Sequence, residues 1–393
     1  MNAPNRGKAS YNMKQELIET FKKLYGDGGD IRIFFAPGRV NLIGEHTDYN
    51  GGHVFPCALN MGTYMIIRKR EDRVLNFYSE NRKELGIITS GLDQLYYTEQ
   101  AGWTNYPKGV LWAMKRDGYE ISSGMDVFVY GNIPGGAGLS SSASLEVVIA
   151  LAVKELFGFT DLSLIDLAKL CQYAENHYNG VNCGIMDQFT VAVGRKNNCI
   201  FLNTNDLTYQ YVPLDLSDAK IVVTNSKVKH NLAESGYNRR RSECEEALKE
   251  LQEVVDISGF GDFSKELFEA NATAIKDPSL LRRARHAVYE NLRTIEAVNA
   301  LSEGNLVKFG ILMNDSHRSL RDDYQVSCEE IDRLVELAWE HPGVIGSRIT
   351  GGGFGGCTVS IVKQDFVDSF THHVGKGYQE SFGHDPEFYV IET

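Results

Sequence analysis

The feature that most constrains the fold is the glycine-rich segment Gly131–Ala143. It follows Met125–Val129, where apolar and other residues alternate as in a strand, and it precedes the largely apolar run Leu145–Leu156, which suits a buried helix. Glycines let a backbone approach a ligand closely, and a helix N-terminus offers free N–H groups and the positive end of its dipole. The order strand, loop and helix therefore predicts a phosphate-binding loop, with a tight structural turn as the alternative.

The common phosphate-binding motifs do not match this loop. A Walker A motif needs Gly-Lys-Ser/Thr, but no lysine occurs between Gly131 and Val153. The dinucleotide motif GxGxxG begins at Gly136 and Gly138 but has Ser141 where its last glycine belongs. The loop is thus of another type.

Helices and strands are mixed along the rest of the chain without the regular βαβ rhythm of a doubly wound sheet. Expected helices cover residues 12–25, 163–178 and 239–255, and expected strands cover 31–36, 63–68, 74–78, 219–224, 344–349 and 358–362. Ser163 and Asp166 resemble a capping box at the start of the second helix. With 393 residues, the chain predicts an α+β protein of two domains, residues 1–205 and 206–393.

Composition argues against several partners. A net charge of −12 disfavours nucleic acid and anionic membrane surfaces, because both favour a basic face. The basic runs Arg239–Arg241 and Arg282–Arg285 are interpreted as solvated or ion-paired helix faces. Seven scattered cysteines without a CxxC pair favour a reducing compartment, and no apolar stretch or signal-like N-terminus is present. We therefore expect a cytoplasmic protein.

A cluster of polar and charged residues lies in Ala36–Gly52. It places Arg39, Glu45, His46 and Asp48 within ten residues, with glycines on both sides, and it is expected to be a loop after a strand. Carboxylates accept hydrogen bonds from hydroxyls and imidazole donates or accepts, so this set suits a polyol. A zinc site is the weaker alternative, since no second histidine stands at helical spacing, and a structural histidine is the plain alternative for His46 alone.

A third glycine cluster, Ile349–Thr358, is expected to join two strands. Glycine-rich turns between strands are often structural, so this cluster indicates a ligand site only in combination with the other two segments. It would provide a second backbone surface that closes over a nucleotide.

Taken in chain order, the three segments resemble the signature motifs of the GHMP kinases, with Ala36–Gly52 as the first motif, Gly131–Ala143 as the second and Ile349–Thr358 as the third. Gly38–Tyr49 and Asn182–Phe189 resemble the galactokinase family within that group, and the matches extend from about residue 30 to about residue 360. The resemblance implies an N-terminal mixed-sheet domain like that of ribosomal protein S5. It also implies a C-terminal ferredoxin-like antiparallel-sheet domain, with the active site between the two.

The resemblance also implies residue roles. Asp187 would be the catalytic base, with Arg39 as its partner. The implied substrate-binding residues are Glu45, His46, Thr47, Asp48, Gly184, Asp187 and Tyr237. The implied phosphate loop comprises Gly136, Ala137, Gly138, Leu139, Ser140, Ser141 and Ser142. Ser142 and Glu175 match Mg²⁺ ligands, and Ser79 is expected near the nucleotide.

The implied activity is phosphorylation of α-D-galactose by ATP at the anomeric hydroxyl, the first kinase step of galactose catabolism. ATP and Mg²⁺ are the expected cofactors, and the expected protein is a monomer with only small-molecule partners. An N-acetylgalactosamine or arabinose kinase on the same scaffold is the nearer alternative. A catalytically inactive galactose sensor is the more distant one, because such relatives have a damaged Ser-Ala segment whereas Ser140–Ala143 is intact here.

Overall fold

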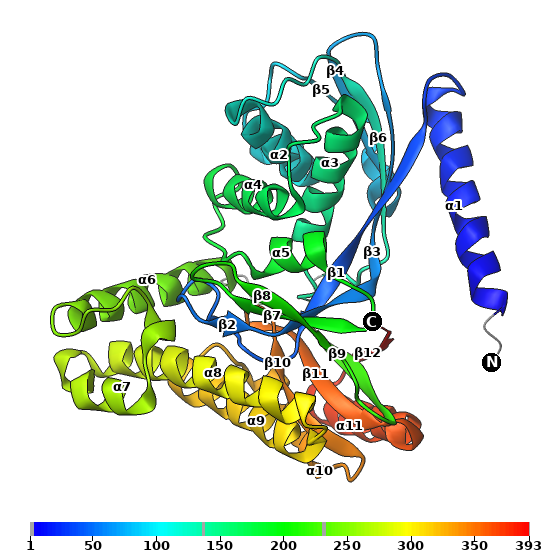
Figure 1. The fold of residues 1–393 in the computed structure, drawn as a ribbon. Helices are drawn as coiled ribbons and strands as arrows, with labels where there is room; N and C mark the ends of the chain where they lie inside the picture. Colours follow the sequence, from blue (N-terminus) through cyan, green and yellow to red (C-terminus); the bar gives the residue numbers. More distant parts are fainter. Residues whose placement is uncertain (1–3, 136–137, 230–232, 393) are drawn as a thin grey trace. The chain divides into compact units, whose positions relative to one another are not determined.

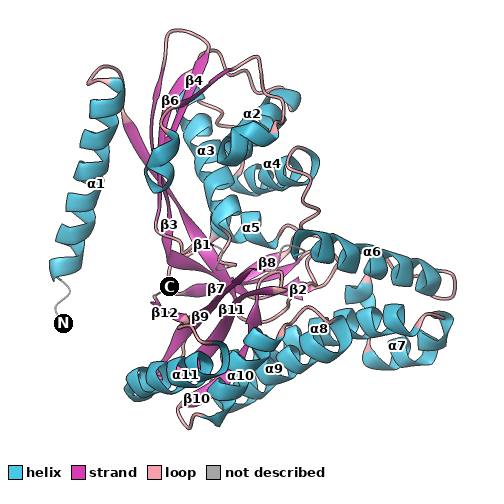
Figure 2. Cartoon of the chain, turned by 180° about the vertical axis from the view of Figure 1, so that it is seen from behind, coloured by secondary structure: helices cyan, strands magenta, loops and turns pink. Residues whose placement is uncertain are grey.

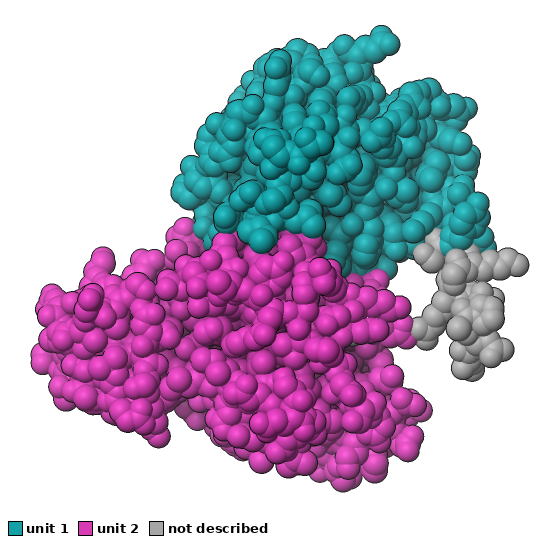
Figure 3. Space-filling model, viewed as in Figure 1, with its two compact units in different colours: residues 1–38, 61–133, 141–180 teal, residues 39–60, 134–140, 181–393 magenta. Residues whose placement is uncertain are grey.

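The computed structural model describes residues 4–135, 138–229 and 233–392, which divide into two compact units. Unit 1 comprises Met1–Gly38, Met61–Ile133 and Ser141–Gly180, and unit 2 comprises Arg39–Asn60, Pro134–Ser140 and Val181–Thr393 (Figure 3). The two units interleave along the sequence, and strand β3 (Pro56–Lys69) contributes residues to both.

Unit 1 is built on a mixed sheet. The second half of β3 pairs antiparallel with β6 (Met125–Gly131), which pairs parallel with β4 (Val74–Ser79), and β4 pairs with β5 (Ile88–Gly91). Helix α1 (Pro4–Tyr25) packs on one face of this sheet through Leu17 and Phe21, while α2 (Asn105–Arg116), α3 (Ser141–Phe157) and α4 (Leu164–His177) lie on the other (Figures 1 and 2).

The local signals of the sequence are mostly confirmed in unit 1. Helix α3 follows the glycine-rich loop as predicted, and the side chain of Ser163 caps α4 by accepting a hydrogen bond from the backbone N–H of Asp166 at 3.1 Å. Several boundaries were wrong. Strand β3 begins at Pro56 instead of residue 63. Helix α1 begins at Pro4 instead of residue 12, and β1 (Arg32–Asn41) continues five residues beyond its predicted end at residue 36. Arg39 therefore lies on a strand and not in a loop.

Unit 2 contains a four-stranded antiparallel sheet in the order β10 (Val344–Thr350), β11 (Gly355–Lys363), β9 (Ala219–Lys229) and β12 (Glu387–Ile391). The predicted strands at 219–224, 344–349 and 358–362 are confirmed as parts of β9, β10 and β11. Helices α9 (Leu306–Ser319), α10 (Glu329–Glu340) and α11 (Val367–Phe382) pack on this sheet.

Unit 2 contains further helices outside this sheet. Helix α6 (Ala233–Gln252) packs against α8 (Pro278–Ser302), and a π-helical turn, Leu320–Tyr324, follows α9. The remaining elements of this unit are α5 (Met186–Val193), α7 (Lys265–Asn271), β2 (His53–Val54), β7 (Asn198–Asn203) and β8 (Tyr209–Pro213). The helix predicted at 239–255 is α6, which begins and ends earlier than expected.

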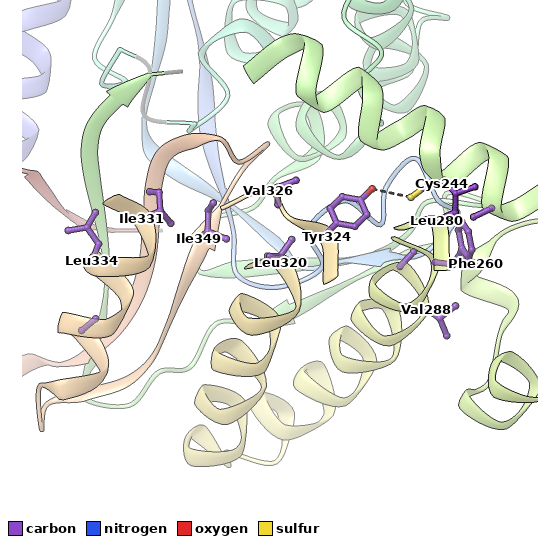
Figure 4. Packing of buried hydrophobic residues seen from close by; sticks show 14 of the residues in the cluster. Cys244, Phe260, Leu280, Val288, Leu320, Tyr324, Val326, Ile331, Leu334 and Ile349 are labelled. Atoms are coloured by element: carbon purple, nitrogen blue, oxygen red, sulfur yellow. Dashed lines mark hydrogen bonds between the residues drawn. The ribbon is translucent and has the colours of Figure 1, made fainter. Parts of the chain in front are cut away.

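One hydrophobic core joins these helices to the sheet. Figure 4 shows Leu320, Tyr324 and Val326 packed among residues of α6, α8, α10 and β10. Tyr324 is completely buried, and its hydroxyl lies against the thiol of Cys244 on α6. Among the described residues, no helix combines the length and the apolar character needed to cross a membrane.

Candidate active site

The centre of the candidate site is an ion pair between Arg39 and Asp187. Arg39 stands near the end of β1, and Asp187 lies in the first turn of α5. Nε of Arg39 donates to Oδ1 of Asp187 at 2.7 Å and Nη2 donates to Oδ2 at 2.8 Å, which is a bidentate arrangement. The arginine side chain is 5% exposed and the aspartate side chain 27%, so the carboxylate is held firmly and still faces accessible space.

The described part of the phosphate loop is attached to this pair. Nη1 of Arg39 donates to the carbonyl of Gly138 at 2.7 Å, and the backbone N–H of Arg39 donates to the carbonyl of Leu139 at 3.2 Å. The hydroxyl of Ser140 donates to Oδ2 of Asp187. Ser140 has a φ of 61°, an unfavourable conformation for a residue with a Cβ. The loop is thus held in a strained shape by the Arg39–Asp187 pair.

The other predicted loop residues are placed as follows. Gly136 and Ala137 lie outside the described residues. Ser141 is exposed at the start of α3, and Ser142 is half-buried in its first turn.

The third glycine cluster is the turn between β10 and β11, as predicted, and it lies against the phosphate loop. A Cβ added to Gly351 would come within 3.2 Å of the carbonyl oxygen of Gly138, and one added to Gly138 would lie 3.6 Å from the carbonyl oxygen of Thr350. Gly351 also has a φ of 88°, which a larger residue rarely adopts. Glycine at 351 therefore lets the two backbones lie in contact.

Glu45 is held by the turn after β10. One of its carboxylate oxygens accepts hydrogen bonds from the backbone N–H of Gly351 at 3.0 Å and the hydroxyl of Thr350 at 3.2 Å. The same oxygen lies 3.4 Å from Nη1 of Arg348, which is itself completely buried. The carboxylate thus joins the first motif to the third.

A second buried carboxylate fixes the backbone of the same motif. Oε1 of Glu290 on α8 accepts from the backbone N–H of Gly44 at 3.0 Å and from the hydroxyl of Ser316 at 2.5 Å. Its other oxygen accepts from Nε of Arg293 at 2.9 Å. Burial alone would raise the pKa of Glu290, but these cationic and donor groups hold it at about 2.

The side chain of Thr47 makes hydrogen bonds within the first motif. It is completely buried, and its hydroxyl lies 2.9 Å from the carbonyl of Gly44 and 2.7 Å from that of His53. The side-chain amide of Asn50 donates to the carbonyl of His46 at 2.6 Å. These hydrogen bonds fix the backbone of the loop and so the orientation of its other side chains.

His46 lies in a cluster of aromatic rings. Its ring centroid is 4.8 Å from that of Tyr324 and 5.4 Å from that of Tyr237, and Nδ1 lies 2.7 Å from the hydroxyl of Tyr49. Burial lowers the pKa of His46 to about 3, so the ring is neutral at physiological pH. Its φ of 61° is again unfavourable for a residue with a side chain, as found at other functional positions.

Asp48, Gly184 and Tyr237, three predicted substrate-binding residues, lie close to one another. A Cβ at Gly184 would fall 2.0 Å from Oδ2 of Asp48, so only glycine fits there. Desolvation and the carboxylates of Asp187 and Glu45 raise the pKa of Asp48 to about 7. Desolvation, and to a lesser extent the carboxylate of Asp48, raises the pKa of Tyr237.

The charges around Arg39 explain why its pKa is raised. Burial opposes its charged form, but Asp187, Glu45 and Asp48 together raise the pKa of Arg39. One cation therefore faces three carboxylates, and Asp48 is the one that takes up a proton near neutral pH.

Besides Ser141, three predicted residues belong to unit 1. Ser79 is buried at the end of β4, Ser142 is in the first turn of α3, and Glu175 is buried on α4. Glu175 and Glu146 both lie close enough to Cys171 to add to the effect of burial in raising the pKa of that thiol. Hydroxyl and carboxylate oxygens are the ligands that Mg²⁺ prefers. Ser142 and Glu175 thus fit the expected metal. Within the described ranges, no three His, Cys, Asp or Glu side chains form a metal-binding group.

Several residues that shape the site were not predicted from the sequence. Glu290, Arg348 and Tyr324 are all completely buried and contact the first motif from elements far along the chain. Nothing in their local sequence separates them from ordinary helix and strand residues, because their partners lie more than 240 positions away.

Comparison with known families agrees with this geometry. The chain matches the galactokinase galactose-binding signature over residues 19–69, the GHMP kinase N-terminal domain over residues 105–195 and the GHMP kinase C-terminal domain over residues 296–378. It is 52% identical over 375 residues to a galactokinase of Clostridium beijerinckii, covering 95% of this chain and 96% of that one. The chain belongs to the galactokinase family.

Further relatives extend the comparison. A galactokinase of Bacillus subtilis is 48% identical, with 97% of each chain covered. A crystal structure of Lactococcus lactis galactokinase complexed with galactose superposes with a TM-score of 0.94 at 45% identity, covering 97% of this chain and 98% of the other. A Methanococcus jannaschii mevalonate kinase, at 17% identity and a TM-score of 0.65, shares the fold. The predicted α+β class and the predicted family are confirmed.

Proposed function

We propose that the protein transfers the γ-phosphoryl group of ATP to the anomeric hydroxyl of α-D-galactose, giving galactose 1-phosphate and ADP. The observation that carries the proposal is the bidentate Arg39–Asp187 pair, set within the motifs of a chain that belongs to the galactokinase family. Curated relatives at about half identity over nearly the whole chain are galactokinases.

Asp187 is proposed to take the proton of the reacting hydroxyl. The anomeric oxygen then attacks the γ-phosphorus, and the bond to the β-phosphate oxygen breaks as ADP leaves. Proton removal by a positioned carboxylate is typically worth about 10²- to 10⁴-fold in rate. The two hydrogen bonds from Arg39 support this role, because they fix the orientation of the carboxylate before the sugar arrives.

Arg39 is proposed to have a second task. Its Nη1 reaches the carbonyl of Gly138 in the phosphate loop, so the same guanidinium spans the base and that loop. Phosphoryl transfer spreads negative charge over the equatorial oxygens, and a fixed cation nearby stabilises it.

Sugar recognition is assigned to the first motif and its neighbours. Asp48, His46 and Tyr237 carry the polar atoms proposed to meet the sugar hydroxyls, and Gly184 leaves room for Asp48. Glu45 and Thr47 are proposed to bind sugar in the family manner, although the contacts described above give both a part in holding the loop.

The nucleotide is proposed to lie on the phosphate loop, Gly136–Ser142, with Ser79 nearby. Mg²⁺ would be held by Ser142 and Glu175, and when bound it neutralises charge on the phosphates of ATP. A cytoplasmic, monomeric enzyme remains our proposal for its location and assembly.

The test is ADP release with Mg·ATP against galactose, glucose, N-acetylgalactosamine, arabinose and mevalonate, with the Asp187→Ala protein as blank. Turnover on galactose that is lost in the variant is the expected result. Turnover only on another acceptor would reassign the sugar pocket. Galactose binding without turnover on any of the five would instead identify a sensor.

A further inference from the structure

The hydroxyl of Ser140 is bonded to the carboxylate of the proposed base. Of the three consecutive serines in the phosphate loop, Ser140 is buried, Ser142 is half-buried and Ser141 is exposed. Ser140 donates a hydrogen bond to Oδ2 of Asp187, and both residues belong to unit 2. The side chain of Ser140 therefore has a partner other than a phosphate group.

The direction of this hydrogen bond is fixed by Arg39. Nε of Arg39 donates to Oδ1 of Asp187 at 2.7 Å, and Nη2 donates to Oδ2 at 2.8 Å. A guanidinium has N–H donors and no acceptor, so both oxygens of Asp187 accept hydrogen bonds from it. Because the carboxylate of such a pair only accepts, the hydroxyl of Ser140 is the donor in the third hydrogen bond.

The three donors are divided unequally between the two oxygens of Asp187. A carboxylate oxygen has room for about two hydrogen bonds. Oδ2 accepts from Arg39 and from Ser140, so its two positions are filled, whereas Oδ1 accepts only from Arg39 among the described residues. The side chain of Asp187 is 27% exposed. Oδ1 is therefore the oxygen that has an open acceptor position.

The backbone before Ser140 holds its hydroxyl in place. The carbonyl of Gly138 accepts from Nη1 of Arg39 at 2.7 Å, and the carbonyl of Leu139 accepts from the backbone N–H of Arg39 at 3.2 Å. Ser140 has a φ of 61°, and strained positions of this kind persist where the surrounding structure fixes them, often at functional sites. One arginine thus fixes both the carboxylate and the residue that donates to it.

We propose that Ser140 is a positioning residue that occupies Oδ2 of Asp187 and so leaves Oδ1 to accept the proton of the anomeric hydroxyl. In that step the O–H bond breaks and its proton passes to Oδ1. The electron pair of the sugar oxygen forms the bond to the γ-phosphorus, and the β-phosphate oxygen leaves with its own electron pair. The hydrogen bonds above assign Ser140 to the carboxylate, while the sugar hydroxyl rests on the proposed function.

A defined acceptor oxygen matters for the rate. General-base catalysis requires the base atom within hydrogen-bond reach of the proton that it takes, with the reacting atoms aligned. Without Ser140, the sugar hydroxyl would have two oxygens of Asp187 to meet, and the two resulting poses would direct the sugar oxygen differently. We therefore expect the hydroxyl of Ser140 to affect kcat more than the binding of either substrate.

The first experiment measures ADP release with Mg·ATP and galactose for Ser140→Ala and Ser140→Gly. Both variants lack the hydroxyl, but only glycine adopts a φ of 61° without strain, so the glycine variant serves if the alanine variant fails to fold. Each should lower kcat about ten- to hundredfold, as expected for loss of a hydrogen bond to a charged group, with both KM values changed less than about threefold. Ser217→Gly is the matched control, because Ser217 has a φ of 53° in an exposed turn after β8, and its kcat should be unchanged.

Three results of this experiment would overturn the proposal. The first is a wild-type kcat in Ser140→Gly. The second is a raised KM for ATP with kcat retained, which would assign the hydroxyl to the nucleotide. The third is a loss of kcat confined to the glycine variant, which would assign the effect to the backbone of the loop.

The second experiment tests whether Ser140 acts through Asp187. In the Asp187→Asn background, adding Ser140→Ala should change kcat by no more than about twofold, because the acceptor that Ser140 positions has been removed. A loss as large as that in the native background would refute an action through Asp187. A wild type that turns over no galactose would refute the proposed function and this inference with it, whereas normal turnover with unaffected Ser140 variants would refute this inference alone.

Discussion

Asp48→Asn is expected to stabilise the protein while weakening the proposed binding of galactose. The carboxyl of Asp48 is half-buried beside Gly184, and desolvation with two nearby carboxylates raises its pKa from 3.8 to about 7. Below about pH 4 the group is protonated in the folded and unfolded states alike and contributes nothing. From there to about pH 7 only the native state keeps its proton, so stability falls as the pH rises, and above pH 7 the cost is constant.

The magnitude follows from the two pKa values. A difference of about three pH units corresponds to about 4 kcal/mol, which we halve to about 2 kcal/mol because the side chain keeps some solvent contact. At pH 5 the same calculation leaves less than half of this cost. Asparagine keeps an oxygen to accept from the backbone N–H of Met186, which lies 3.4 Å from Oδ2 in the native protein. With an unfolding entropy of about 2.1 cal/mol/K per residue, 2 kcal/mol raises the Tm of this chain by about 2 °C.

The assay is thermal unfolding of both proteins at pH 5 and pH 8, with galactose binding measured in parallel. Asp256→Asn is the control, because Asp256 is exposed in the loop after α6 and loses the same charge. We expect Asp48→Asn to gain about 2 °C at pH 8, a smaller amount at pH 5, and to lose galactose affinity. A gain in Tm that is independent of pH, or a loss of stability at pH 8, would refute the argument that the desolvated carboxyl of Asp48 destabilises the native state.

Three further variants test other parts of the site. Asp187→Asn should bind galactose but lose about 10²- to 10⁴-fold in kcat, and near-native kcat would remove it as the base. Glu290→Ala should cost about 3 kcal/mol in denaturant unfolding, because it leaves buried donors unpaired, whereas Glu296→Ala, an exposed ion pair on the same helix, should cost less than about 1 kcal/mol. Equal losses of unfolding free energy in these two variants would contradict a stabilising role for the buried hydrogen bonds of Glu290. Glu175→Gln should raise the Mg²⁺ concentration for half-maximal activity, and an unchanged requirement would exclude it as a ligand.

The sequence predicted the elements whose signals are local. Strand β6, helix α3 and the Ser163 cap were found because alternation, an apolar run and a capping pair each lie within a few residues. The end of β1 was missed because Gly38 and the polar residues after it are typical of a loop, while tertiary pairing extends the strand to Asn41. The single domain boundary at residue 205 stays a prediction.

Buried charges were the harder problem. The two basic runs were interpreted as solvated or ion-paired faces, and the second reading is correct for Arg240 and Arg283, which share Glu243. Yet both arginines are only 4% exposed and bind backbone carbonyls at the π turn. A helix periodicity cannot reveal this, because the partner carbonyls lie 84 and 40 positions away.

The candidate site holds three carboxylates near one arginine, and each is stabilised differently. Asp187 has the two hydrogen bonds of Arg39, and Glu45 has Arg348, Thr350 and a backbone N–H. Asp48 also lies near Arg39, but desolvation and the carboxylates of Asp187 and Glu45 outweigh that cation and raise the pKa of Asp48 to about 7. A neutral polyol both donates and accepts hydrogen bonds, so carboxylates with different partners beside a neutral imidazole would match it better than three equivalent groups. Unequal stabilisation of these carboxylates is therefore consistent with the sugar-binding role proposed for them.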